Sequence, residues 1–214
     1  MQQLIRFTAF ALAALLVILA AHPAAAQERA EGQSKADYLA WLSRDPGARA
    51  QVLSFKAFLE AGEVDDVVPT WQLVRTASKW RDCGGPRFEV APVAEWAHIS
   101  STLEFIKDEV EPVIGKVQAV SGFRNEELNR CAGGAKASAH AHFYALDLVP
   151  VADDLSRGTL IREICDIHQS TGRRFDIGLG FYTGMRFHLD SKGYRRWGAN
   201  GSGATSPCAT GNYA

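Results

Sequence analysis

Histidine and aspartate side chains stand at spacings that suit a metal site. His140 precedes Asp147 by seven residues, and Asp147 lies in the apolar run 145–149. A carboxylate inside such a run is costly to bury unless it meets a cation or a metal ion. The position of Asp147 therefore indicates a charged partner.

A second apolar segment carries His188 and Asp190. Alternation along a strand places both on one face, with Arg186 beside them. Two histidines and one aspartate, here His140, His188 and Asp147, can hold zinc at three points and leave a fourth position for water, as a hydrolase requires. A hydrogen-bonded structural pair of histidine and aspartate is the alternative that the spacing leaves open.

A small sheet with helices packed on it would position these residues. Short apolar or β-rich runs predict strands over 113–121, 144–150, 175–181 and 185–190, the last two around a turn at Thr183-Gly184. Apolar residues at helical spacing predict helices over 92–111, 126–131 and 155–170. We therefore expect an α+β fold, with a small, largely antiparallel sheet and flanking helices.

The chain before this unit has a helical pattern. We expect helices over 34–41, capped by Ser34 or Asp37, and over 48–61. Segment 67–79 is either a third helix or extended. The cluster 83–86 (Cys-Gly-Gly-Pro) marks a boundary. We expect a helical N-terminal extension over 27–82 and a domain over 83–214 that ends in a glycine-rich tail.

Two stretches of the chain resemble the signatures of the zinc D-Ala-D-Ala peptidases, which share a fold with the amino-terminal signalling domain of hedgehog proteins. The first stretch contains Ser121-Gly122-Phe123-Arg124, Asn129, Gly133-Gly134-Ala135, Ser138-x-His140 and Ala145-x-Asp147. The second contains Gly178-x-Gly180-x-Tyr182 and Phe187-His188-Leu189-Asp190, and it ends near Tyr194-Arg195-Arg196-Trp197. The resemblance covers roughly 90–198, about half of the chain, and implies the hedgehog/DD-peptidase fold.

The resemblance also implies roles for single residues. His140, Asp147 and His188 match the family's ligands, so we expect one zinc ion per chain. Arg124 matches an arginine that would contact a substrate carbonyl or carboxylate and stabilise charge there. Ser138, which would line the cleft, and Tyr182 are the other expected substrate-binding residues.

Two positions depart from the family pattern. Phe143 stands where a glycine is usual, and its ring would alter the loop or narrow the cleft. Met185 stands where several members carry a glutamate as general base. We take Asp190 as the candidate catalytic base, and a role in orienting a ligand histidine is its equal alternative. His142 also lies near, beside aromatic neighbours.

The composition is that of a globular protein without a strong charge. The chain has 214 residues, with 23 Lys and Arg against 24 Asp and Glu and a formal net charge of −1. This balance gives no reason to expect nucleic acid or an anionic membrane as the main partner. The partners expected from the resemblance are peptidoglycan peptides.

The first 26 residues have the order of a secretory signal peptide. One positive charge precedes the apolar run 7–21, and Ala24-Ala25-Ala26 provides a cleavage site. The run is shorter than the roughly 20 residues that span a bilayer. We therefore expect export to the periplasm or beyond, with no membrane anchor after cleavage.

Export favours disulfides among the four cysteines, for which three pairings exist. We favour Cys83–Cys131, which would tie the start of the domain to the first motif, and Cys165–Cys208, which would hold the glycine-rich tail on a helix. Free buried thiols are the alternative.

Three classes of function remain. The first is an exported zinc-dependent peptidase that hydrolyses peptide bonds of peptidoglycan stem peptides, as a D-Ala-D-Ala carboxypeptidase or a cross-link endopeptidase. The second is a catalytically weak or inactive zinc-containing module that binds the cell wall, which Met185 permits. The third is a secreted structural domain without metal.

Overall fold

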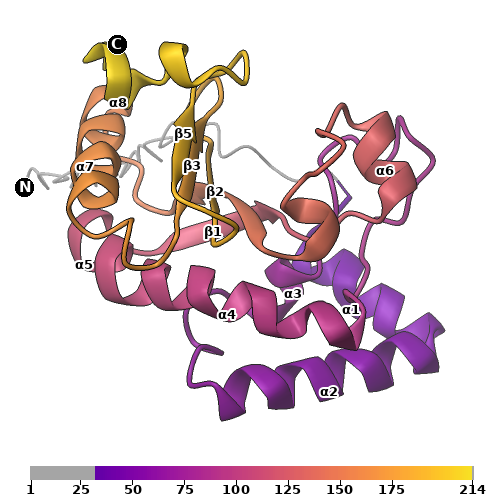
Figure 1. Cartoon of the computed structure of the whole chain (residues 1–214). Coiled ribbons are helices and arrows are strands. Elements are labelled where there is room, and N and C mark those ends of the chain that lie inside the picture. Colours follow the sequence, from indigo (N-terminus) through magenta and orange to yellow (C-terminus); the bar gives the residue numbers. More distant parts are fainter. Residues whose placement is uncertain (1–31, 214) are drawn as a thin grey trace, which may run out of the picture.

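The computed structural model describes residues 32–213, so the signal peptide expected over 1–26 lies outside the described residues. The helices are α1 (Lys35–Arg44), α2 (Pro46–Ala61), α3 (Thr70–Leu73), α4 (Trp96–Phe105), α5 (Glu111–Ile114), α6 (Glu126–Cys131), α7 (Arg157–Ser170) and α8 (Pro207–Thr210). The strands are β1 (Val117–Ser121), β2 (Ala145–Pro150), β3 (Gly178–Phe181), β4 (Phe187–Asp190) and β5 (Arg195–Trp197) (Figure 1). No helix within 32–213 is long and apolar enough to cross a membrane.

The five strands form one sheet in the order β1-β2-β4-β3-β5. The pairings β1–β2, β2–β4 and β3–β4 are antiparallel, whereas β3 and β5 are parallel. The α+β class is therefore confirmed, and the sheet is mixed rather than purely antiparallel. Strand β5 was not expected from the sequence, because three residues are too few to show alternation.

The two faces of the sheet have different roles. Alternate residues of the central strands turn apolar side chains toward the helices, among them Leu146, Leu148, Phe187 and Leu189, which are fully buried. The residues between them, which include Asp147 and His188, point to the other face. Alternation along β2 and β4 thus separates the hydrophobic core from the face that carries the polar cluster.

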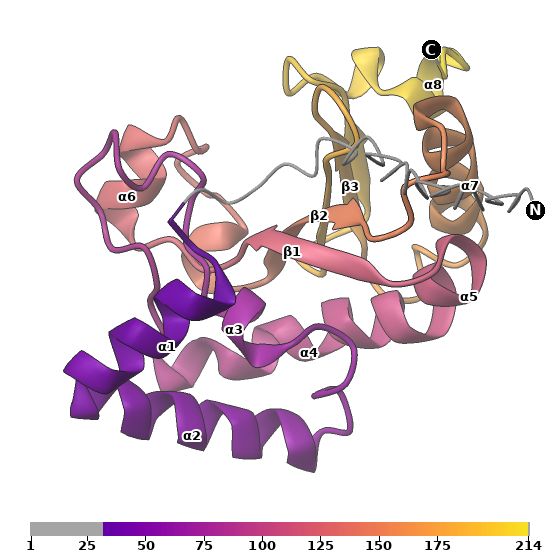
Figure 2. The same cartoon turned by 180° about the vertical axis from the view of Figure 1, so that it is seen from behind.

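Helices cover the apolar face in layers. In Figures 1 and 2, α4 lies between α2 and the sheet, and contacts join α4 to α2, to β2 and to β4. The Phe55 ring of α2 lies 5.2 Å from Trp96 and 5.6 Å from Phe143. The N-terminal helices thus share one hydrophobic core with the rest of the chain. The domain boundary at residue 83 stays a prediction.

The long helix expected over 92–111 is present and extends to Ile114 through changes in its winding. It begins with a 3-10 turn at Val93–Glu95, and a π-helical segment at Ile106–Val110 joins α4 to α5. Pro112 explains the change before α5, because proline lacks an N–H and crowds the carbonyl four residues earlier. A wider π turn accommodates it. By contrast, segment 67–79 contains one helical turn, α3, and Arg75 after it forms an isolated antiparallel bridge with Phe88.

Both expected disulfides are present. Cys83 is bonded to Cys131, which ties the loop between α3 and α4 to α6, and Cys165 of α7 is bonded to Cys208 of α8. The preferred pairing is therefore confirmed. The C-terminal segment is consequently fastened to α7 rather than trailing away from the fold.

Candidate metal centre

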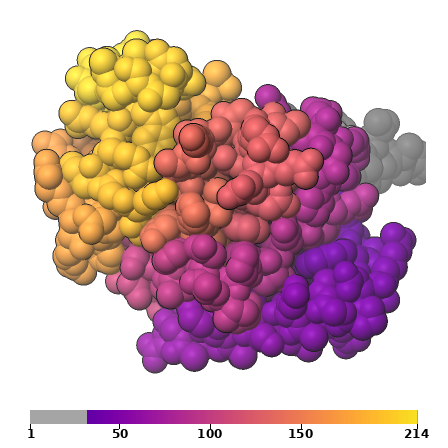
Figure 3. All heavy atoms as spheres, turned by 45° about the vertical axis from the view of Figure 1, so that its right-hand side comes forward, coloured from indigo at the N-terminus to yellow at the C-terminus, as the bar shows by residue number. Residues whose placement is uncertain are grey.

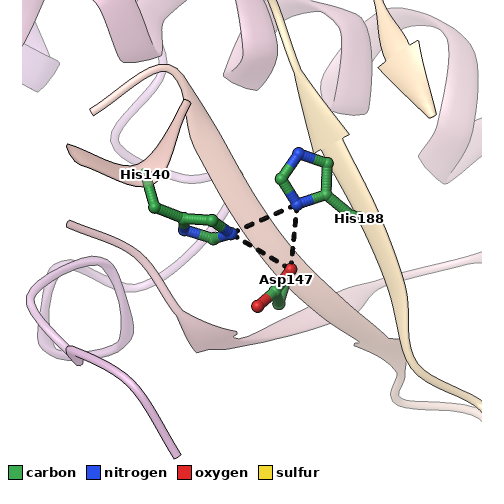
Figure 4. A group of neighbouring side chains, drawn as sticks. All are labelled: His140, Asp147 and His188. Carbon is green, nitrogen blue, oxygen red and sulfur yellow. Dashed lines mark hydrogen bonds and ion pairs between the residues drawn. The ribbon is translucent and has the colours of Figure 1, made fainter. Parts of the chain in front are cut away.

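Three side chains from separate segments meet on the polar face of the sheet. His140 comes from a short 3-10 turn (His140–His142), Asp147 from β2 and His188 from β4 (Figure 4). Asp147 and His188 are direct neighbours across the antiparallel pair β2–β4. The pairing of these two strands therefore brings together residues that are 41 positions apart.

The three potential ligand atoms form a small triangle. His140 Nε2 lies 3.2 Å from Asp147 Oδ1 and 3.2 Å from His188 Nδ1, and the distance from His188 Nδ1 to Asp147 Oδ1 is 3.0 Å. In a tetrahedral zinc site with ligand atoms at about 2.0–2.1 Å from the ion, two ligand atoms lie about 3.3 Å apart, close to the sides of this triangle. All three residues are buried, and together they could hold a metal ion.

The outer partners of the two histidines decide which ring nitrogens face the centre. His140 Nδ1 lies 2.7 Å from the Gly122 carbonyl, and His188 Nε2 lies 2.8 Å from Asp190 Oδ2. Both partners accept hydrogen bonds, so in the neutral rings these nitrogens carry the proton. His140 Nε2 and His188 Nδ1 then present lone pairs beside the Asp147 oxygen. Three convergent lone pairs are a donor set for a cation, and this chemistry fits zinc.

Asp147 is fully buried, yet it has several positive or donating neighbours. Arg124 and Arg186 both donate to Oδ2, and the hydroxyl of Tyr182 donates to Oδ1 at 3.0 Å. Burial acts to raise the pKa of Asp147, but His140, Arg124 and Arg186 lower it well below its usual range. The carboxylate is therefore charged, and the two guanidinium groups hold Oδ2 while Oδ1 faces the histidines.

Burial also changes the proton affinity of the histidines. It lowers the pKa of His140 to about 4, with Arg124 acting in the same direction. Burial acts against the charged form of His188 as well, but hydrogen bonds to Asp147 and Asp190 raise its pKa. His140 is thus neutral near pH 7, the form in which its Nε2 can coordinate a metal.

Asp190 lies behind His188, on the side of the ring away from the ligand nitrogen. Its Oδ2 accepts from His188 Nε2, and both of its oxygens accept from Arg195 at 2.9 and 2.7 Å. The backbone N–H of Lys192 also donates to Oδ1. Burial acts to raise the pKa of Asp190, but His188 and Arg195 outweigh this effect and lower the pKa to about 2. These contacts surround the carboxylate of Asp190 and fix the ring of His188.

The glycines of the second motif leave room for these groups. A Cβ atom on Gly180 would lie 2.2 Å from the Trp197 ring, and one on Gly178 would lie 2.5 Å from both Arg195 and Asp190. The Trp197 ring in turn lies 4.8 Å from the ring of His188. The Gly-x-Gly spacing in β3 is therefore a packing requirement of the neighbouring strand β5.

The structure places the remaining expected residues as follows. Ser138 accepts the His140 N–H at 3.2 Å, so its hydroxyl supports the turn that carries this histidine. His142 is half exposed, and its Nδ1 lies 3.6 Å from Glu95. Phe143 adopts a left-handed conformation (φ 54°) and turns its ring into the core. The ring is therefore part of the core, and the loop keeps the left-handed backbone that a glycine readily adopts.

The contacts of Arg186 and Ser78 were not anticipated from the sequence. Arg186 joins the buried Asp147 to the Ser78 hydroxyl, which lies 3.0 Å from its guanidinium group. Alternation along β4 placed Arg186 on the face of His188, and this was the only indication available. Ser78 is 108 residues away from Arg186 in the chain, and nothing in its neighbourhood pointed to the site.

A comparison with protein families agrees with this geometry. The family model described as peptidase M15 matches residues 74–190. The chain belongs to the peptidase M15 family. This is the family of the zinc D-Ala-D-Ala carboxypeptidases, so the resemblance noted in the two motifs is confirmed. Searches of curated proteins and of solved structures gave no match.

Membership assigns the protein to the metallopeptidases. The range matched to the M15 model contains all three potential ligands, Arg124 and Tyr182. Helices α1 and α2 and the segment after Asp190 lie outside it.

Proposed function

We propose that this protein is an exported zinc-dependent peptidase that hydrolyses peptide bonds in the stem peptides of peptidoglycan. Its action would be either the removal of a terminal D-Ala or the cleavage of cross-links. The main support for the proposal is that lone pairs of His140, His188 and Asp147 converge on one point. Each histidine keeps its ring proton on the nitrogen that faces away from this point. The two disulfides and the substrate's position outside the cytoplasm support export.

In this proposal His140, Asp147 and His188 hold one zinc ion per chain. Bound zinc supplies Lewis acidity and makes a nucleophile available from water near pH 7. Arg124 contacts the substrate carbonyl or carboxylate and stabilises negative charge there, since its guanidinium already lies beside Asp147 and His140. Tyr182 and Ser138 border the cleft, and the Tyr182 hydroxyl keeps Asp147 Oδ1 oriented.

For Asp190 we propose the orienting role rather than that of general base. Its carboxylate lies at His188 Nε2, whereas the ligand nitrogen is Nδ1. Its oxygens already accept hydrogen bonds from His188, Lys192 and Arg195. A carboxylate in this position raises the basicity of the ligand and fixes its tautomer.

The second candidate is a zinc-containing module that binds the cell wall with little or no turnover. It is favoured by Met185, because several family members carry a glutamate at this position as general base. The two candidates share the metal site and differ only in the release of products.

Digestion of defined muropeptides by the zinc-loaded protein, with mass analysis of the products, tests the proposal. We expect loss of a terminal D-Ala or separation of cross-linked dimers, and no product from the H140A/H188A variant. Binding to purified wall without product release would favour the second candidate. If protein with full zinc content neither binds purified wall nor releases products, both candidate functions are rejected.

A further inference from the structure

A cavity of about 370 Å³ lies between the end of β3 and the C-terminal segment, and one of its lining residues, Tyr182, contacts Asp147 of the metal centre. Phe181 and Tyr182 line it at the end of β3, and Ala199, Ala204, Thr205 and Pro207 are among the lining residues from the C-terminal segment. In Figure 3 the C-terminal segment, in yellow, stands out at the top of the molecule. The volume falls within the range of about 300–1,000 Å³ that is usual for ligand sites.

Two aromatic residues connect this cavity to the metal centre. Tyr182 lines the cavity, and its hydroxyl donates to Asp147 Oδ1. The ring of Trp197 lies against His188, and Ala199, two residues later, lines the cavity. A chain with one bond placed at the metal centre would therefore lie next to Tyr182, a residue that also lines the cavity.

The walls of the cavity are fixed within the fold. Cys208, beside the lining residue Pro207, is bonded to Cys165 of α7. Arg157, at the start of α7, donates to the carbonyl oxygens of Tyr182 and Gly184. A ligand would therefore not have to order the C-terminal segment on binding, which lowers the entropic cost of association.

The chemistry of the walls suits a peptide. Apolar surface comes from Phe181, Ala199, Ala204 and Pro207, and threonine hydroxyls lie among them. Arg157 is the one charged residue among the described residues that line the cavity. Small apolar side chains and a carboxylate are complementary to such a surface.

We propose that this cavity is a subsite for the residues of the stem peptide on the acyl side of the cleaved bond, and this rests on the function proposed above. A carboxypeptidase and an endopeptidase both act on a chain that continues on this side. The lining residues of the C-terminal segment follow Asp190, beyond the range matched to the family model.

The test compares a long and a short substrate that share the cleaved bond. The bond is the one identified by muropeptide digestion; the long substrate keeps the full acyl side, and the short one keeps a single acetylated residue. In the zinc-loaded wild type we expect kcat/KM for the long peptide to be on the order of 10- to 100-fold higher than kcat/KM for the short peptide. Ala204→Trp would fill the cavity and remove this advantage, leaving the short substrate within about twofold of wild type.

Ala50→Trp is the matched control, because Ala50 is an exposed alanine of α2 far from the cavity. It should keep the preference for the long peptide. Equal rates on both peptides in the wild type, or an equal loss on both in Ala204→Trp, would overturn the proposal.

A binding measurement separates this proposal from the proposed function. The long peptide without its leaving group is titrated calorimetrically into the wild type and Ala204→Trp, both zinc-loaded. We expect binding at least about tenfold weaker in the variant. A protein that binds this peptide through the cavity but releases no product would contradict the peptidase function alone. Equal affinity in both proteins would overturn the subsite.

Discussion

His140 and His188 each use one ring nitrogen for a fixed hydrogen bond and turn the other toward Asp147. This arrangement makes metal binding a property of three side chains acting together. In the H140A/H188A variant we expect zinc content to fall from about one per chain to less than about one tenth, because a single carboxylate cannot hold the ion. Metal analysis after dialysis measures this.

His98→Ala is the control for that experiment, since His98 bonds to Glu95 outside the ligand set. It should retain zinc. Full zinc content in the double variant would show that the ion is held elsewhere.

The contacts of Asp190 lead to a second prediction at this scale. Asp190→Asn keeps the size of the side chain but removes the charge that faces His188 Nε2 and Arg195. We expect zinc affinity to fall by about 10- to 100-fold, with activity lost in parallel. Zinc affinity and turnover are to be measured on one preparation, with the exposed Asp153→Asn as control. Lost turnover with unchanged zinc affinity would instead assign Asp190 the role of general base.

At the scale of elements, Phe143 connects the turn of His140 to the helical layer. Its ring lies 5.6 Å from Phe55 and 6.2 Å from Phe123, while its backbone is left-handed. Phe143→Gly would relieve about 1–2 kcal/mol of backbone cost but lose about 3–5 kcal/mol of packing. We expect a net loss of about 1–4 kcal/mol in the free energy of unfolding, measured by urea denaturation. Phe143→Leu should lose less, and a more stable glycine variant would contradict this account.

The junction between α7 and β3 gives a pH-dependent prediction. His168 is buried, its Nε2 lies 2.8 Å from the Ile177 carbonyl, and burial lowers its pKa below 6.5. As the pH falls below 6.5, the unfolded chain takes up the proton first, so protonation favours unfolding. The stability from neutral His168 is therefore complete above this pH and decreases below it.

Urea denaturation at several values between about pH 7 and pH 5 measures this effect. His168→Gln should show a shallower decrease than the wild type, and the exposed His142→Gln, away from this junction, should match the wild type. If stability decreased equally steeply with falling pH in all three proteins, the effect could not be assigned to His168.

At the scale of the whole molecule, two disulfides close long loops. They join residues 48 and 43 positions apart, and the chain-entropy model gives each about 4 kcal/mol of stabilisation. We expect no reactive thiol in unreduced, denatured protein and four after reduction, with a lower Tm for the reduced protein. Thiol titration and thermal unfolding measure both. Four reactive thiols before reduction would contradict the pairing.

The sequence by itself determined the local features of this protein. Alternation predicted that His188 shares a strand face with Asp190, and apolar periodicity located α2, α7 and the long helix before β1. These features depend on backbone geometry that repeats every two or 3.6 residues, so a short window of sequence contains them. The two motifs added the family and the three potential ligands.

The tertiary structure decided what depends on contacts between distant segments. The position of Asp190 behind the His188 ring, and the contact of Arg186 with Ser78, follow from strand order and loop paths that no short window contains. The parallel strand β5 and the cavity beside Tyr182 arise because the C-terminal segment folds back and is bonded to α7. Close packing allows few such arrangements, and the side chains of the whole chain together select one.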